Sequence, residues 1–267
     1  MMSYCKICNS LVQTACASRG RWGDWNRRGG EEMLELNRIY NEGCIEGMKK
    51  VERNSINLLL TDPPYNISRD NNFTTMGRSG IDFGEWDKGF DQFSWLNEIP
   101  RILHKDGSVI IFNDWKNIGE IARYCQSLGL VIKDMLRWKK TNPMPRNRDR
   151  RYVTDFECAI WLTNKNAKWT FNRQSETYQR PEFECGIVSG NEKTPHPAQK
   201  PIKLLEEIIL IHSNENDTVL DCFLGSGSTA IACINTNRNY IGFELDPTYY
   251  AIAEERIKKA KRGLNRI

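Results

Sequence analysis

Short apolar runs alternate with amphipathic segments along the chain from Met33 onward. Runs of strand length end in polar or glycine-containing turns, and most are followed by residues with helical spacing. This alternation predicts a mainly parallel sheet covered on both faces by helices, an α/β fold. We expect strands at 34–40, 56–61, 108–113, 131–138, 156–162, 218–221 and 240–244, and helices at 45–51, 93–103, 118–128, 202–213, 228–235 and 249–262.

Three segments lack this pattern. Residues 1–32 are polar and rich in Gly and Arg, which favours a flexible N-terminal extension before one folded domain at 33–267. This extension contains Cys5, Cys8 and Cys16, but a zinc site usually needs four ligands, so a metal knuckle is the weaker interpretation. Residues 66–92 and 164–194 are polar and irregular, and we expect loops there.

The composition excludes several classes of protein. The chain has 267 residues, of which 39% are hydrophobic and 27% charged, as in an ordinary globular protein. No apolar run approaches the roughly 20 residues that a membrane span needs. The first residues contain no apolar leader, and the nine cysteines follow no regular spacing. These features predict a cytoplasmic protein with reduced thiols and argue against a disulfide scaffold.

The positive charge is concentrated in one segment. Residues 137–151 contain seven basic residues and one acidic residue, against a net charge of +4 for the whole chain. A loop of this kind, interrupted by prolines, is suited to phosphate groups, although a solvated loop remains an alternative. The candidate nucleic-acid contacts are Lys139, Lys140, Arg146, Arg148, Arg150 and Arg151.

A glycine-rich motif lies between a predicted strand and a predicted helix. It reads Asp221-Cys222-Phe223-Leu224-Gly225-Ser226-Gly227-Ser228-Thr229, and Glu244 ends the next predicted strand. Small residues let a ligand approach the backbone, and a carboxylate there can accept both ribose hydroxyls of a nucleoside. Gly225, Gly227 and Ala230 also fit the dinucleotide pattern, so a nicotinamide cofactor stays open, whereas the lysine of a phosphate-binding P-loop is missing.

A second motif, Thr61-Asp62-Pro63-Pro64-Tyr65-Asn66, directly follows a predicted buried strand. The two prolines fix the backbone, and the Asp62 carboxylate and Pro63 carbonyl are hydrogen-bond acceptors. Tyr65 offers a flat face on which a planar ring can stack. Together they suit a base whose exocyclic amine donates both hydrogens, which exposes the nitrogen lone pair to an electrophilic methyl group.

At these residues the sequence resembles the DNA amino-methyltransferases, which methylate adenine N6 or cytosine N4 with S-adenosylmethionine. Asp62-Pro63-Pro64-Tyr65 is similar to their catalytic motif, and the segment 221–229 is similar to their cofactor motif. The catalytic motif comes first, as in the circularly permuted β group, and His196-Pro197-Ala198-Gln199-Lys200-Pro201 resembles a segment of that group. Cys222 departs from the proline that is usual in the family, and Ser228 from a common threonine.

The resemblance implies a Rossmann-like methyltransferase fold, circularly permuted, with a mixed and mainly parallel sheet. It implies that 33–267 is the catalytic domain and that 164–194 recognises the target sequence. It also implies base flipping, a role in restriction–modification, and a possible homodimer acting on double-stranded DNA. The cofactor residues implied are Asp221, Phe223, Leu224, Gly225, Ser226, Gly227 and Glu244, with Lys200 near the methionine end of the cofactor.

Adenine is the expected base because Asp62 begins the catalytic motif, whereas Ser-Pro-Pro-Tyr is more usual for cytosine N4. Three alternatives remain: a cytosine-N4 methyltransferase, a nicotinamide-dependent oxidoreductase, and a DNA-binding module without catalysis. The oxidoreductase leaves the segment 62–65 unexplained. Methylation of cytosine C5 is disfavoured, because it needs a nucleophilic cysteine that follows proline in that family, and no Pro-Cys pair occurs here.

Overall fold

The computed structural model describes residues 27–28, 31–32, 34–67, 89–145 and 148–264. The chain divides into two units, Met1–Met33 and Leu34–Ile267. In the first unit the strands β1 (Arg27–Arg28) and β2 (Glu31–Glu32) pair in antiparallel fashion. Cys5, Cys8 and Cys16 lie outside the described residues, so the N-terminal extension stays a prediction.

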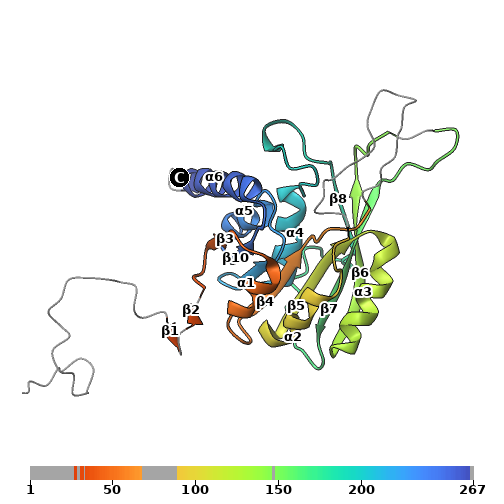
Figure 1. The fold of residues 1–267 in the computed structure, drawn as a ribbon. Helices are drawn as coiled ribbons and strands as arrows, with labels where there is room; N and C mark the ends of the chain where they lie inside the picture. The colour runs from red at the N-terminus through yellow and green to blue at the C-terminus, as the bar shows by residue number, and fades with distance from the viewer. Residues whose placement is uncertain (1–26, 29–30, 33, 68–88, 146–147, 265–267) are drawn as a thin grey trace, which may run out of the picture. The chain divides into compact units, whose positions relative to one another are not determined.

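The second unit is built on one sheet of eight strands in the order β3-β10-β9-β4-β5-β7-β6-β8 (Figure 1). Five of the seven neighbouring pairs in this described sheet are parallel, and only the two pairs made by β7 are antiparallel. The expected mixed, mainly parallel α/β sheet is therefore confirmed. The strands are β3 (Arg38–Tyr40), β4 (Ile56–Thr61), β5 (Leu103–Asn113), β6 (Leu130–Lys140), β7 (Phe156–Asn164), β8 (Glu182–Cys185), β9 (Thr218–Asp221) and β10 (Asn239–Phe243).

Helices cover both faces of this sheet (Figure 1). They are α1 (Cys44–Lys50), α2 (Ile99–Ile102), α3 (Trp115–Ser127), α4 (Ile202–His212), α5 (Ser228–Asn235) and α6 (Pro247–Leu264), with short 3-10 turns η3 (Ser94–Glu98) and η4 (Gly190–Glu192). Among the described residues, no helix is long and apolar enough to cross a bilayer.

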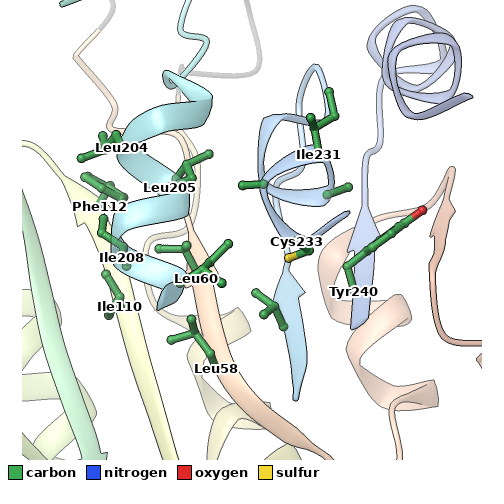
Figure 2. Packing of buried hydrophobic residues seen from close by; sticks show 14 of the residues in the cluster. Leu58, Leu60, Ile110, Phe112, Leu204, Leu205, Ile208, Ile231, Cys233 and Tyr240 are labelled. Carbon is green, nitrogen blue, oxygen red and sulfur yellow. The ribbon is translucent and has the colours of Figure 1, made fainter. Parts of the chain in front are cut away.

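Alternate residues of the central strands enter different cores, as the period of a strand requires. Leu58 and Leu60 of β4 face α4 and α5, where they meet Leu205 and Ile208 of α4 (Figure 2). On the opposite face, Leu59 packs with residues of α1, η3, α2 and α3. Because β4 and β5 are apolar on both faces, they form the buried centre of the sheet, and their ends are held firmly.

Three expectations need correction at the element boundaries. The strand predicted from residue 34 begins only at Arg38, because Asn37 adopts a left-handed conformation, with φ of 62°, and interrupts the extended chain. β5 begins at Leu103 rather than at residue 108, and Gly107 lies inside it, where a Cβ would stand 2.9 Å from the Ile56 carbonyl oxygen. β8 lies in a segment expected to be irregular; it has four residues and pairs with β6.

Candidate active site

The two sequence motifs meet at one edge of the sheet. β4 and β10 both run parallel to β9, so the carboxyl ends of the three strands point the same way. Asp62 follows β4, Asp221 ends β9, and Glu244 follows β10. Ligands of open α/β sheets bind beyond the carboxyl ends of the strands, so this edge is the candidate site.

Asp62 lies in a cluster of charged side chains. Its Oδ1 accepts a hydrogen bond from the Tyr65 hydroxyl at 2.5 Å, and its Oδ2 accepts one from the Lys200 ammonium. Lys200 is almost fully buried and also contacts Glu157 Oε2 at 3.1 Å. Glu157 Oε1 in turn binds the Lys140 ammonium at 2.6 Å. The structure thus places Lys200 beside the catalytic motif, and its contact with the cofactor stays a prediction.

The backbone of the catalytic motif is held by three amide side chains. Gln92 Nε2 donates to the Pro64 carbonyl at 2.6 Å, and Asn117 Nδ2 donates to the Tyr65 carbonyl at 2.8 Å. Asn113, at the end of β5, links the two by donating to Gln92 and accepting from Asn117. Within the described residues no donor reaches the Pro63 carbonyl. That carbonyl is the acceptor expected to receive the target amine.

The two carboxylates of the cluster differ in their pKa. Burial raises the pKa of Asp62 above its ordinary value, and Lys200 offsets this only in part. Burial also acts on Glu157, but the positive charges of Lys200 and Lys140 outweigh it and lower its pKa to about 2. Lys200 has a raised pKa, since Asp62 and Glu157 together outweigh its burial. Lys200 therefore stays charged, and of the two carboxylates Asp62 takes up a proton more readily.

Asp221 connects three elements. Its Oδ1 accepts hydrogen bonds from the Thr61 hydroxyl at 2.7 Å and from the Phe223 amide at 3.1 Å, and its Oδ2 accepts one from the Thr229 hydroxyl at 2.6 Å. The carboxylate thereby ties the end of β4 to the start of α5. The amide of Cys222 donates to the Thr61 hydroxyl at 3.2 Å, a bond that proline could not make.

The glycine turn after β9 forms a cradle whose shape depends on missing side chains. Gly225 and Gly227 have φ of 55° and 84°, which disfavours other residues. A Cβ on Gly225 would stand 3.0 Å from His196 Nε2. Glu244 Oε2 accepts from the Gly225 amide at 2.7 Å, and its Oε1 accepts from the Asp246 amide at 2.8 Å. Each carboxylate oxygen of Glu244 therefore retains a lone pair for a further donor. The burial that raises the pKa of Glu244 also shields this carboxylate from solvent. These residues fit the sugar of a nucleoside cofactor.

The other residues of the cofactor motif have different surroundings. Phe223 is partly buried between the rings of Phe90 and Trp95. Leu224 is a buried core residue. Ser226 is buried, and its carbonyl and hydroxyl both bind Arg256 of α6. These contacts rigidify the turn, and direct contact of Leu224 and Ser226 with a cofactor stays a prediction.

Residues 137–140 of the basic segment, which was expected to form a loop, belong to β6, and the rest lies in the connection between Lys140 and the start of β7, next to the charged cluster (Figure 1). Arg148, Arg150 and Arg151 are exposed there. Lys139 pairs with Glu184 at 3.4 Å. Lys140 is mostly buried and bound to Glu157, so we omit it from the proposed DNA contacts. Arg146 lies outside the described residues.

The aromatic residues of the segment 164–194 have two different environments. Phe171 stacks on Trp161 of β7, and Trp169 meets the edge of the same ring. Both rings therefore pack on the sheet through Trp161, with Trp169 partly buried and Phe171 43% exposed. Tyr178 is 95% exposed. Recognition of a target sequence by this segment stays a prediction.

Glu157 is a site residue that the sequence motifs do not reveal, as are the three amides Gln92, Asn113 and Asn117 that hold the catalytic motif. Glu157 stands in no recognised motif, and its partner Lys140 belongs to the basic segment, whose charge predicts a nucleic-acid contact instead. One signal was present, because Glu157 is a charged residue directly before the apolar run Cys158–Leu162 of β7. A carboxylate in that position needs a cation when it is buried.

Comparison with known proteins identifies a family. A family model described as DNA methylase matches residues 56–255. The chain is 35% identical to the type II methyltransferase M.HinfI of Haemophilus influenzae, over 87% of this chain and 71% of that one. It is 32% identical to the type II methyltransferase M.HpaI of Haemophilus parainfluenzae, over 86% of this chain and 77% of that one.

Solved structures lead to the same family. The crystal structure of the M1.HpyAVI–SAM complex has 37% identity and a TM-score of 0.67, with 82% of this chain and 98% of that chain covered. The cytosine-N4-specific PvuII DNA methyltransferase has 18% identity and a TM-score of 0.66, with 85% and 92% covered, and shares the fold.

The fold and the site define a class of enzyme, the amino-methyltransferases that use S-adenosylmethionine. Within that class the chain belongs to the DNA methylase family of N6 and N4 amino-methyltransferases, in its β group, with the catalytic motif before the cofactor motif. DNA is its substrate. The resemblance inferred from Asp62–Tyr65 and from residues 221–229 is confirmed, and the oxidoreductase and the non-catalytic module are set aside.

Proposed function

We propose that this enzyme methylates the N6 amine of adenine in double-stranded DNA after the base has left the helix. The observation that carries this proposal is the segment Asp62–Tyr65, which is anchored by amides at two carbonyls, while no donor from the described part of the chain reaches the Pro63 carbonyl. The Asp62 carboxylate and the Pro63 carbonyl accept the two hydrogens of the target amine. Tyr65 packs against the plane of the base.

The chain's own groups perform two tasks in this reaction. By accepting both hydrogens, Asp62 and Pro63 draw the nitrogen lone pair out of conjugation with the ring and direct it at the methyl group. After transfer, the amine carries one proton in excess. Asp62, whose pKa burial raises, takes that proton or passes it to water.

S-adenosylmethionine supplies the electrophilic methyl group. The residues proposed to hold it are Glu244, for the ribose hydroxyls, and the turn formed by Gly225 and Gly227. Asp221 is proposed to shape the cofactor site indirectly, because all its described hydrogen bonds go to protein groups that form the turn.

Adenine is preferred over cytosine because Asp62 stands where Ser is more usual in cytosine-N4 enzymes. M.HinfI and M.HpaI, at 35% and 32% identity, are named type II methyltransferases. This supports a role in restriction–modification. The fold itself does not discriminate between the bases, since the cytosine-N4-specific PvuII enzyme shares it.

The location and assembly are also proposals. The described cysteines are all free thiols, which fits a reducing cytoplasm. Arg148, Arg150 and Arg151 are proposed to contact the phosphates of the duplex, because they extend from the strands that carry the charged cluster. The family resemblance favours a homodimer.

Methyl transfer from labelled S-adenosylmethionine to unmethylated genomic DNA tests the proposal. The product nucleosides are separated and identified by mass. N6-methyldeoxyadenosine is the expected product. N4-methyldeoxycytidine would overturn the base assignment while keeping the site, and no incorporation by an enzyme that binds the cofactor would overturn DNA methylation itself.

A further inference from the structure

The charged cluster contains more groups than the proposed chemistry uses. Two carboxylates, Asp62 and Glu157, share the Lys200 ammonium, and Glu157 also binds Lys140. The four groups come from four separate places: the end of β4, the start of β7, the end of β6 and the residues just before α4. Two negative and two positive charges balance, which permits the cluster to be buried.

Lys200 occupies the position that a target amine needs. Its ammonium donates to Asp62 Oδ2 and stands 5.4 Å from the centre of the Tyr65 ring. An exocyclic amine that donates to Asp62 beside Tyr65 would meet the same oxygen. Oδ2 retains a second lone pair, but Lys200 Nζ also lies 3.3 Å from the Tyr65 hydroxyl, so the amine and the ammonium compete for the space between Asp62 and Tyr65.

An ammonium that leaves Asp62 needs another acceptor, because a buried charge without a partner is strongly unfavourable. Glu157 Oε2 lies 3.1 Å from Lys200 Nζ, so the acceptor is already in contact. Lys140 holds the other oxygen of Glu157 at 2.6 Å and fixes the carboxylate in place. A small shift of Lys200 toward Glu157 therefore opens Asp62 without exposing a bare charge.

We propose that Glu157 is a positioning residue for methyl transfer, which receives Lys200 when the target amine takes its place on Asp62. This inference rests on the proposed function and adds to it a residue outside both sequence motifs. Glu157 acts through Lys200 and touches neither the base nor the cofactor. The lowered pKa of Glu157 supports this role, because that carboxylate remains charged while Asp62 handles a proton.

The test compares Glu157→Gln, Lys200→Met and the double variant by the pH dependence of kcat on unmethylated genomic DNA. Glu157→Gln removes the second acceptor, so Lys200 stays on Asp62, and kcat falls by at least about tenfold. The acidic limb of the profile then moves to lower pH, because Asp62 has lost a negative neighbour. Lys200→Met moves that limb to higher pH, because Asp62 has lost its cation.

The double variant gives the most specific result. In Lys200→Met the cation that lies between the two carboxylates is gone and only Lys140 still pairs with Glu157, so neutralising Glu157 removes a repulsion from Asp62. The double variant is therefore more active than Lys200→Met alone, and its acidic limb returns toward that of the wild type. The groups that act on Asp62 in this titration are Lys200, Glu157 and Tyr65; Lys140 acts on Glu157, and Asp62 in turn acts on Asp221.

Glu98→Gln is the matched control, because Glu98 is about as exposed as Glu157 and also pairs with a basic residue, Arg101 at 2.7 Å, but lies outside the cluster. It keeps the wild-type kcat and profile. Glu157→Asp keeps the negative charge and replaces Glu157→Gln in the test if the Gln variant unfolds. The acidic limb of its kcat profile is expected to stay near that of the wild type. Thermal unfolding of the wild type, Glu157→Gln, Lys200→Met and the double variant measures the Glu157–Lys200 interaction independently of activity. We expect Glu157→Gln to lower the melting temperature more when Lys200 is present than when it is replaced.

A kcat of Glu157→Gln close to the wild type would overturn the inference. So would limbs that move in the same direction, or a double variant no better than Lys200→Met. The proposed function fails separately, through a wild-type enzyme that transfers no methyl group to DNA.

Discussion

Asp62 differs from a surface aspartate in its neighbours. Its two oxygens are already engaged by Tyr65 and Lys200, and it lies at the end of a buried strand. A carboxylate held in this way is aimed at one point, so that Lys200, and not the carboxylate, moves when a base arrives. Its burial also brings its pKa closer to neutrality, which suits a group that accepts a proton from a methylated amine.

Replacing Asp62 with Ala should abolish turnover without loss of the cofactor. We expect kcat to fall by at least ~100-fold, since the amine loses its acceptor. Affinity for S-adenosylmethionine, measured by calorimetry, stays at the wild-type value, because Asp62 does not shape the glycine turn. A parallel loss of cofactor binding would place Asp62 in the cofactor site instead.

The elements of the site are joined by Asp221, which holds β4, β9 and α5 together through its carboxylate. Burial raises the pKa of Asp221 from 3.8 to about 6, although the two threonine hydroxyls and the Phe223 amide oppose it. The folded protein therefore binds the proton of this group more tightly than the unfolded chain does. Its favourable contribution is complete below pH 3.8 and is lost as the pH rises through about 6.

This titration predicts a pH-dependent difference between the wild type and Asp221→Asn. The free energy of unfolding of the wild type relative to the variant should fall by about 1–2 kcal/mol between pH 5 and pH 7.5. Urea denaturation at a series of pH values measures it, and the other titrating groups cancel in the difference. A difference that does not change with pH would mean that Asp221 is not protonated in this range.

The glycine turn gives a second prediction for the elements. Gly227→Ala places a Cβ 3.0 Å from the Cβ of Ala253 in α6 and forces a left-handed conformation. We expect a loss of about 1–2 kcal/mol in the free energy of unfolding, together with weaker cofactor binding. Gly119→Ala, in the exposed middle of α3, should gain about 0.5–1 kcal/mol. Equal effects of the two substitutions on thermal unfolding would contradict the strain at Gly227.

The order of elements could be predicted where the local pattern and the packing agree. The apolar run of β4 and the helical spacing of apolar residues in α4 both match the surfaces that these elements bury, and both motifs lie at the ends of strands. β8 was missed because its pattern carries little information: four residues, of which only Phe183 is buried. Its position depends on pairing with β6, which no local pattern records.

The cluster around Lys200 was missed for a similar reason. Lys140 and Glu157 are separated by a basic loop and come together only because β6 and β7 are neighbours. Counting charge along the chain assigned Lys140 to a nucleic-acid surface, whereas the fold turns it inward. Sequence motifs identify functional groups that are close together along the chain. Charged residues that pair across neighbouring strands, such as Lys140 and Glu157, are identified only from the structure.

For the whole molecule, the exposed arginines between β6 and β7 are proposed to bring DNA to the site. Replacing Arg148, Arg150 and Arg151 with Ala should weaken DNA binding and lower the slope of log Kd against log salt by roughly 2–3, at about 0.9 per phosphate contact. The matched control removes three positive charges from α6, at Lys258, Lys259 and Arg262. Equal slopes for the two triple variants would show that total charge, and not this loop, binds the duplex.

The most direct measurement is made in a host that lacks DNA methylation and expresses either the wild type or Asp62→Ala. The chromosomal DNA is hydrolysed, and methylated nucleosides are counted by mass spectrometry. We predict N6-methyldeoxyadenosine with the wild type and none with Asp62→Ala, at equal levels of folded protein. N4-methyldeoxycytidine with the wild type, or N6-methyldeoxyadenosine that persists in the variant, would contradict adenine methylation by the Asp62 site.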